Sequence, residues 1–316
     1  MAHTSIAKEK LFYEDGSMRI GAFEVEEDLP EMRDPHVIAV LVPWLDAGRV
    51  GALSLAQLRE HFGARDIGKL AVPGRFFDFT RYRPNVSYVD GERVLTMPNT
   101  TISYARPDEG PDLLFLHMLE PHAFAETYIQ SILRILKSIG IKRHVRLGAS
   151  YGSVPHTRPL PVSYTLNGQR IDLRTGDIIE QQMYYEGPTS IMNSVTNGLE
   201  ESGIESMSLM VRLPYYAQLE EDYTGMARLL ETFSDLYHVP SLFTDTIAKD
   251  RTRGERQYRR ISAELVNNPA AKALVEQLES DYDAQPTQRS TSENLPPLSP
   301  DIEKFLREMD DQLGNA

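Results

Sequence analysis

Residues 36–42 read His36-Val37-Ile38-Ala39-Val40-Leu41-Val42, a nearly continuous apolar run that is rich in β-branched side chains. Such a run is typical of a strand that is buried on both faces of a sheet. Apolar residues then recur at helical spacing from Val50 to Phe62, and Gly63 follows as a stop signal. A buried strand followed by a helix is the repeating unit of α/β proteins, so this stretch predicts a parallel sheet covered by helices.

The same alternation continues as far as about Pro214. Further strands are predicted at 66–72, 112–117, 145–149 and 206–213, helices at 123–139 and 191–201, and a hairpin at 86–96 around Asp90-Gly91. Strands that alternate with helices favour a three-layer αβα fold with a mostly parallel central sheet. We therefore expect residues 1–220 to form an α/β core domain.

After Pro214 the pattern becomes purely helical. Helices are predicted at 223–236, 242–266 and 270–283, so residues 221–283 are expected to form a helical extension. In the middle helix the apolar positions Ile247, Gly254, Tyr258, Ile261 and Leu265 form an inward stripe, which places the arginines between 251 and 260 on the solvated face.

The last part of the chain has a different composition. Residues 284–299 are rich in Pro, Ser, Thr and Gln, which predicts a flexible linker. Residues 300–316 predict an amphipathic helix with Ile302, Phe305, Leu306 and Met309 on one face. That face is expected to dock on the body of the protein or on a partner.

Composition limits the classes of function. The 316 residues include no cysteine, which excludes disulfides, thiol nucleophiles and thiolate metal sites. A net charge of −13 repels phosphate backbones, so nucleic-acid binding is not expected unless a local patch reverses the charge. The longest apolar run is far shorter than a membrane span, so we expect a soluble, cytoplasmic protein without membrane insertion.

The common catalytic motifs are missing from the sequence. It contains no phosphate-binding loop, no dinucleotide-binding glycine motif, no Gly-x-Ser-x-Gly and no His-Glu-x-x-His. The eight histidines are scattered, and none is spaced with another as a pair of metal ligands. We predict neither a cofactor nor a metal.

One loop nevertheless has the composition of a binding site. Gly152-Ser153-Val154-Pro155-His156-Thr157-Arg158-Pro159 follows a predicted strand, and its two prolines leave His156, Thr157 and Arg158 little backbone freedom. In one interpretation the loop closes on itself, with Arg158 paired to a carboxylate and His156 hydrogen-bonded to a backbone carbonyl. In the other, these three side chains bind a ligand, and His156 acts as an acid or base.

Other candidates also follow predicted strands. Ligands of open parallel sheets bind outside the carboxyl ends of the strands, and Trp44, Asp46, Glu120 and Tyr215 all occupy such positions. If the strands are neighbours, these residues share a rim with His156, where Glu120 is a second candidate acid or base. Asp46 can instead cap the helix that is expected from Ala47, and Trp44 and Tyr215 can simply pack.

The segment before the helix at 191 is a further candidate. Tyr185-Glu186-Gly187-Pro188-Thr189-Ser190 precedes that helix, and Gly187 and Thr189 fit either an anion-binding helix start or a self-capping one. Glu186 is a candidate carboxylate partner for Arg158 or His156.

An ordered set of sequence blocks resembles a known family. The blocks are Pro43-Trp44-Leu45-Asp46-Ala47-Gly48, Phe76-Phe77-Asp78, Arg83-Pro84, Leu119-Glu120-Pro121, Val154-Pro155-His156-Thr157-Arg158-Pro159, Tyr185-Glu186-Gly187-Pro188-Thr189, Leu213-Pro214-Tyr215-Tyr216 and Leu278-Glu279-Ser280-Asp281-Tyr282-Asp283. Over residues 36–310 the chain resembles the proteasome assembly chaperone 2 family, in particular its long bacterial, actinobacterial branch. The resemblance implies a three-layer αβα core similar to the phosphorylase/hydrolase-like fold of nucleoside phosphorylases.

The resemblance also implies a function. Eukaryotic and archaeal relatives act on proteasome assembly without being enzymes, and some dock through a C-terminal hydrophobic-Tyr-any tail. This sequence ends Asp311-Gln312-Leu313-Gly314-Asn315-Ala316, without a tyrosine. The leading hypothesis is a non-enzymatic assembly or interaction protein with a protein partner or with self-association as a homo-oligomer. The alternative is an enzyme or small-molecule binder for an anionic or nucleoside-like ligand, in which Arg158 and the 187–190 amides clamp the anion.

Overall fold

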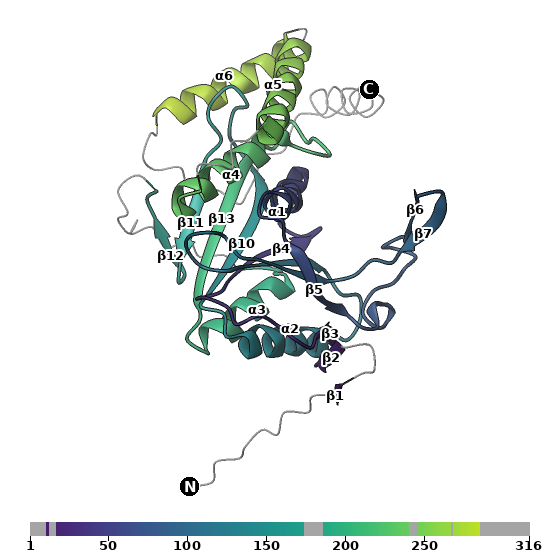
Figure 1. The fold of residues 1–316 in the computed structure, drawn as a ribbon. Helices are drawn as coiled ribbons and strands as arrows, with labels where there is room; N and C mark the ends of the chain where they lie inside the picture. The colour runs from purple at the N-terminus through teal and green to yellow at the C-terminus, as the bar shows by residue number, and fades with distance from the viewer. Residues whose placement is uncertain (1–10, 13–16, 174–185, 240–244, 267, 285–316) are drawn as a thin grey trace. The chain divides into compact units, whose positions relative to one another are not determined.

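A computed structural model describes residues 11–12, 17–173, 186–239, 245–266 and 268–284. The chain folds as two compact units, each built from separate stretches of sequence. The first unit draws on Met1–Val42, Phe62–Val145 and Pro188–Ser206, and the second on Pro43–His61, Arg146–Gly187 and Met207–Ala316. The elements of both units are labelled in Figure 1.

The first unit contains a sheet in the order β1-β2-β3-β5-β8-β9-β4. Its strands are β1 (Leu11–Phe12), β2 (Ser17–Ile20), β3 (Phe23–Glu26), β4 (His36–Val42), β5 (Arg65–Leu70), β8 (Thr101–Ala105) and β9 (Leu113–Leu119). The strands β4 and β9 are parallel, in a register that pairs His36 with Leu113 and Val42 with Leu119. The other neighbouring pairs of this order, which are β1-β2, β2-β3, β3-β5, β5-β8 and β8-β9, are antiparallel. A separate hairpin is formed by β6 (Asn85–Val89) and β7 (Glu92–Thr96).

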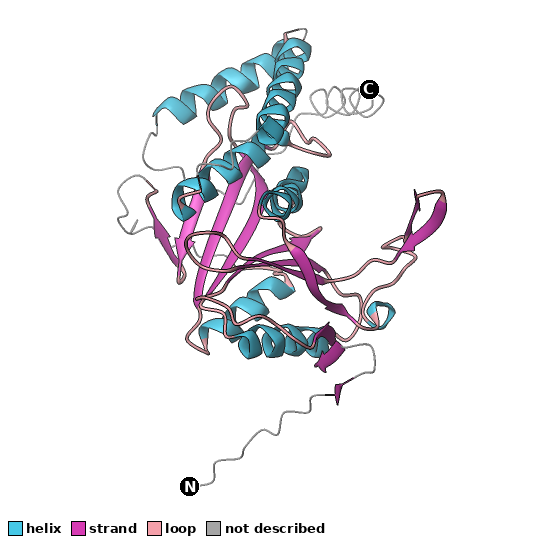
Figure 2. Cartoon of the chain, viewed as in Figure 1, coloured by secondary structure: helices cyan, strands magenta, loops and turns pink. Residues whose placement is uncertain are grey.

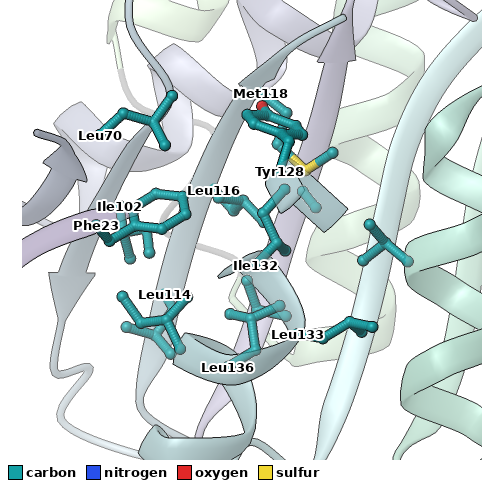
Figure 3. Close-up of a cluster of buried hydrophobic side chains, with 14 of the residues drawn as sticks. Phe23, Leu70, Ile102, Leu114, Leu116, Met118, Tyr128, Ile132, Leu133 and Leu136 are labelled. Carbon is teal, nitrogen blue, oxygen red and sulfur yellow. The ribbon is translucent and has the colours of Figure 1, made fainter. Parts of the chain in front are cut away.

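The hydrophobic core of the first unit is formed by its strands together with two of the described helices. Helix α2 (Ala125–Ile139) and helix α3 (Ile191–Glu200) pack their apolar faces against the strands (Figure 2). Figure 3 shows Ile132 and Leu136 of α2 beside Leu114 and Leu116 of β9, all fully or almost fully buried. The apolar run at 112–117, which predicted a buried strand, thus contributes Leu114 and Leu116 to this core.

The second unit combines four strands with four of the described helices. Its strands β10 (Arg143–Gly152), β13 (Glu205–Pro214), β11 (Val162–Leu166) and β12 (Gln169–Ile171) follow one another in that order. β11 pairs antiparallel with β12 and with β13, and an isolated parallel bridge joins Asp46 to Ala149 of β10. The helices are α1 (Val50–His61), α4 (Tyr223–Tyr237), α5 (Asp245–Leu265) and α6 (Pro269–Ala284).

Helices α4 and α5 of the second unit cross in close contact at Gly254 (Figure 1). A Cβ at this position would lie 2.5 Å from the backbone nitrogen of Thr224. The predicted stripe of Ile247, Tyr258, Ile261 and Leu265 is buried. Arginines on the other face of α5 pair with carboxylates, as Arg251 does with Glu231, so the predicted division of this helix into two faces is confirmed.

The predicted αβα class with a mostly parallel central sheet is confirmed, and antiparallel strands add to it. The sequence pattern did not predict β1, β2, β3, β8, β11 and β12. These strands are short, and β11 and β12 have no fully buried residue, so they lack the continuous apolar run that identified β4 and β9. In the described residues after β13 there are helices and no strand, as expected.

The expected domain boundaries at 220 and 283 stay a prediction. The helices α4 to α6 fall in the same compact unit as β10, β11, β12 and most of β13. The expected linker at 284–299 and the expected helix at 300–316 lie outside the described residues, apart from Ala284.

The crossing at Gly254 generates a test of this packing. Alanine normally stabilises a helix relative to glycine by about 0.5–1 kcal/mol. Because the backbone of α4 leaves no room for a methyl group, we expect Gly254→Ala to reduce the free energy of unfolding by about 1–3 kcal/mol. Urea denaturation measures this change, and Glu255→Ala on the exposed neighbouring position is the control. A more stable Gly254→Ala variant would mean that the two helices are not packed this closely.

Candidate functional site

His156 lies at the centre of a buried hydrogen-bond network in the second unit. Its backbone N–H donates to the hydroxyl of Tyr216 over 2.8 Å, and its Nδ1 is 2.7 Å from the same oxygen. Its Nε2 is 2.8 Å from Oγ of Ser262, whose hydroxyl donates to the carbonyl oxygen of Tyr258. The imidazole thus joins the loop to Tyr216, two residues after the end of β13, and to Ser262 of helix α5.

The neutral imidazole is the form that satisfies this network. If the Tyr216 hydroxyl donates to Nδ1, then Nε2–H donates to Ser262, and every donor has an acceptor. Burial, with the side chain 7% exposed, lowers the pKa of His156 to about 4. The arrangement therefore holds the imidazole in one tautomer, with both ring nitrogens engaged by the protein itself.

Arg158, two residues later, is held by helix α6. Its Nε and Nη2 donate to the two carboxylate oxygens of Asp283 over 3.0 and 2.8 Å, and Nη1 donates to Glu279 over 3.3 Å. The Thr157 hydroxyl donates to Glu279, and the Tyr282 hydroxyl donates 2.7 Å to the carbonyl oxygen of Pro159. Arg158 does meet a carboxylate, as expected, but its partners are on α6, whereas Glu186 was the candidate from the sequence.

Asp46 and Gly48 have structural roles in the second unit. Oδ1 of Asp46 accepts from the backbone N–H groups of Gly51 and Ala52 over 2.6 and 3.2 Å, which caps the first turn of α1. Asp46 therefore caps a helix, as expected, but that helix begins at Val50 and not at Ala47. Residues Ala47–Arg49 form a short 3₁₀ turn, whose start receives no side-chain hydrogen bond. Gly48 has a φ of +57°, and a Cβ there would lie 2.7 Å from the Cβ of Asp222.

Asp222 continues this set of contacts into helices α4 and α5. It caps α4 through a 2.7 Å bond from the N–H of Gly225, and it accepts a 2.9 Å bond from the hydroxyl of Tyr258. Its own N–H donates to the carbonyl oxygen of Gly48 over 2.8 Å. Desolvation raises the pKa of this fully buried carboxyl, so it depends on these donors.

The two aromatic candidates differ in exposure. Tyr215 is 4% exposed and packs edge-on against Tyr216, with ring centroids 5.9 Å apart. Trp44 is 43% exposed in the loop before Asp46. Packing therefore accounts for Tyr215, whereas Trp44 has surface available to a partner.

Glu120 of the first unit lies at the start of helix α3. Its Oε1 accepts from the N–H of Ile191 over 3.4 Å, so a carboxylate already faces this helix N-terminus. Its Oε2 and the Oγ of Ser190 are buried and have no hydrogen-bond partner among the described residues. Burial also raises the pKa of Glu120.

The segment that precedes α3 is described only from Glu186 onward. Glu186, Gly187 and Thr189 are exposed, and Thr189 accepts a hydrogen bond from the side chain of Asn193 within α3. Tyr185, which the motif also includes, lies outside the described residues.

In the structure, His156, Thr157 and Arg158 lie together with residues that were not among the predicted site residues. Tyr216, Ser262, Glu279 and Asp283 complete the cluster in the second unit. A signal was available, because Glu279 and Asp283 are four residues apart on one helical face. A shared rim with Glu120 stays a prediction.

Neither a cluster of metal-binding side chains nor a membrane-spanning helix is found among the described residues. No group of three or more His, Asp or Glu side chains among them is arranged to hold a metal ion. No helix among them is long and apolar enough to cross a membrane.

These features define an α/β protein whose strand-end loop is closed by its own C-terminal helices. The family model of the PAC2 family matches residues 40–262, so the chain belongs to the PAC2 family. None of the curated proteins matches it by sequence.

Solved structures share this fold. A protein of unknown function from Corynebacterium glutamicum is 20% identical, with a TM-score of 0.71 over 85% of this chain and 99% of its own. A PAC2 family protein from Streptomyces avermitilis is 26% identical, with a TM-score of 0.64 over 77% of this chain and 100% of its own. A Mycobacterium tuberculosis proteasome-assembly chaperone homologue is 24% identical, with a TM-score of 0.62 over 76% of this chain and 99% of its own.

The lowered pKa of His156 predicts a loss of stability in mild acid. The unfolded chain takes up a proton near pH 6.5 and the folded chain only near pH 4, so stability is complete above pH 6.5 and falls as the pH drops toward 4. Between pH 7.5 and 5, this histidine should remove about 2 kcal/mol from the free energy of unfolding.

Denaturant titrations at the two pH values measure this loss. We expect His156→Gln to be less stable at pH 7.5 but to lose about 2 kcal/mol less on acidification. His36, whose pKa burial also lowers to about 4, contributes equally to both proteins. The same substitution at the exposed His122 is the control. An unchanged pH dependence in His156→Gln would mean that His156 is not buried in its neutral form.

The contacts of Arg158 predict that α6 loosens without it. Because Asp283 and Glu279 hold this side chain from α6, Arg158→Gln should speed amide hydrogen exchange in α6 several-fold. Exchange in α2 of the first unit should not change. Arg93→Gln, which removes the same charge from the exposed β7 strand, is the control. Equal exchange in both variants would contradict a role of Arg158 in holding α6.

Proposed function

We propose that the chain is a non-enzymatic protein-interaction protein of the assembly-chaperone type. The observation that carries this proposal is the engagement of His156 and Arg158 by the chain itself. Tyr216 and Ser262 occupy both ring nitrogens of the histidine, and α6 occupies three nitrogens of the guanidinium. An acid–base catalyst needs a proton position that faces substrate, and this histidine offers none in the described structure.

Family membership supports the same proposal. A relative with the same fold is described as a proteasome-assembly chaperone homologue. We propose by extension that unassembled subunits of a larger complex are the partners, with self-association as a homo-oligomer as a further property. Neither role needs a cofactor.

A binding experiment tests this function. The full chain is mixed with purified proteasome α-subunits of the encoding organism or with their assembled core particle, and complexes are followed by native mass spectrometry. We expect the chain to bind the unassembled subunits and to speed formation of the particle several-fold. Serum albumin at the same concentration is the control. If the chain neither binds the α-subunits nor changes the rate at which the particle forms, the proteasome-directed form of the proposal is contradicted.

The alternative function is binding or conversion of a small molecule in the first unit. It is favoured by the buried Oε2 of Glu120 and the Oγ of Ser190, which have no partner in the described structure. Since the Glu120 carboxylate already faces the N-terminus of α3, this position suits a hydroxyl-bearing, nucleoside-like ligand better than an anion.

Incubation of the full chain with nucleosides and inorganic phosphate separates the two functions. We expect no conversion by liquid chromatography for the unmodified chain or for Glu120→Gln. Conversion by the unmodified chain that Glu120→Gln abolishes would establish the enzyme and overturn the non-enzymatic proposal.

A further inference from the structure

The first unit carries a groove that contains none of the candidate residues discussed above. Its volume is about 790 Å³, and it lies between helix α2, the turn that joins β2 to β3, and the segment after β5. Ala22, Val72 and Phe76 contribute apolar surface, while Arg19, Arg75 and Arg134 contribute positive charge. Its size falls within the usual range for ligand sites.

Hydrogen bonds between the three segments hold the groove in shape. The N–H of Ala22 donates to Oγ of Ser131 over 3.1 Å, and that hydroxyl donates 2.7 Å to the carbonyl oxygen of Thr127. The N–H of Ala71 donates 3.0 Å to the carbonyl oxygen of Ala22. A site whose walls are already fixed loses little conformational entropy when it binds.

Two of the arginines are available to an anion. Arg75 lies over the ring of Phe124, 5.1 Å from its centroid, and forms no ion pair with the described residues. Arg134 likewise has no carboxylate partner within the described part of the chain. Other arginines of this unit are paired, for example Arg106 with Asp112 and Arg143 with Glu205. Unpaired guanidinium groups are notable in a chain with a net charge of −13.

The spacing of these two cations limits the kind of ligand. Arg75 lies against Phe124 at the start of α2, and Arg134 lies ten residues further along the helix, which corresponds to a rise of about 15 Å between positions 124 and 134 of the backbone. An extended peptide covers this length in four to five residues, at about 3.3 Å each. A single phosphate or carboxylate offers its charge at one point, whereas a peptide of this length offers one carboxylate to each arginine.

We propose that this groove binds an extended acidic peptide segment of a partner protein, with two carboxylates four residues apart on either side of apolar side chains. One carboxylate pairs with Arg75 and the other with Arg134, and the apolar residues between them contact Val72 and Ala22. The choice of a peptide rests on the proposed protein-interaction function.

Glu126 favours a peptide over a polyphosphate chain. It also lines the groove, two residues after Phe124, and so lies between the two cations along α2. A nucleic acid carries a negative charge at every nucleotide and would bring a phosphate close to this carboxylate, whereas a peptide can place a neutral residue there.

Isothermal titration calorimetry with the full chain tests the inference. The probe is the acetylated and amidated peptide Gly-Glu-Val-Ala-Leu-Glu-Gly, and its counterpart has glutamine at both glutamate positions. We expect the acidic peptide to bind at least tenfold more tightly than its counterpart and to weaken as salt is added. Arg75→Gln combined with Arg134→Gln should weaken the acidic peptide at least tenfold, whereas Arg93→Gln on β7 should not.

Each other outcome overturns the inference. No binding of the acidic peptide up to millimolar concentration, equal binding of both peptides, or unchanged binding by the double variant would each do so. Displacement of the peptide by equimolar inorganic phosphate would assign the groove to a simple anion. Thermal melts of the variants verify that these exposed substitutions leave the fold intact.

The assembly experiment separates this inference from the proposed function. If the unmodified chain and the double variant speed assembly equally, the groove is not the partner site although the function stands. If the peptide binds the groove but the unmodified chain does not affect assembly, the groove stands and the proteasome-directed function fails.

Discussion

The second unit depends on one buried constraint, the requirement that His156 be hydrogen-bonded on both ring nitrogens. An imidazole that is 7% exposed loses its water, so its donors and acceptors must be met by protein groups. Ser262 of α5 meets one nitrogen and Tyr216 meets the other. The loop that contains His156 can therefore be buried only when α5 is in place. Burial of the loop after β10 thus depends on the helices that follow β13.

The same reasoning explains why this site was easy to find in the sequence and hard to interpret. Two prolines, a histidine and an arginine in eight residues signal a rigid polar loop, and the structure contains one. Whether such a loop serves a ligand or the fold depends on Glu279 and Asp283, more than a hundred residues away. The spacing of these two carboxylates shows that they share a helical face, but it does not show that this face lies beside the loop, so both interpretations stay open until the chain is folded.

The fold was predictable where burial leaves a periodic signal. The strands β4 and β9 are continuous apolar runs because both of their faces are covered, and α2 has an apolar face at a spacing of 3.6 residues. β11 and β12 have no such signal, because none of their residues is fully buried and much of their stabilisation comes from backbone hydrogen bonds that any sequence can make. The division into two units is equally hidden, because each unit combines segments distant in sequence.

The charge distribution explains how an acidic protein can select an anionic partner segment. At physiological ionic strength a charge acts over about 8 Å, so an approaching anion experiences the overall −13 charge only weakly once it is inside a groove lined by arginines. Outside the groove the same net charge repels nucleic acids and other polyanions. Selectivity for the proposed segment would then arise from the combination of the two, because only a ligand whose negative charges all lie between Arg75 and Arg134 gains the attraction without meeting the repulsion.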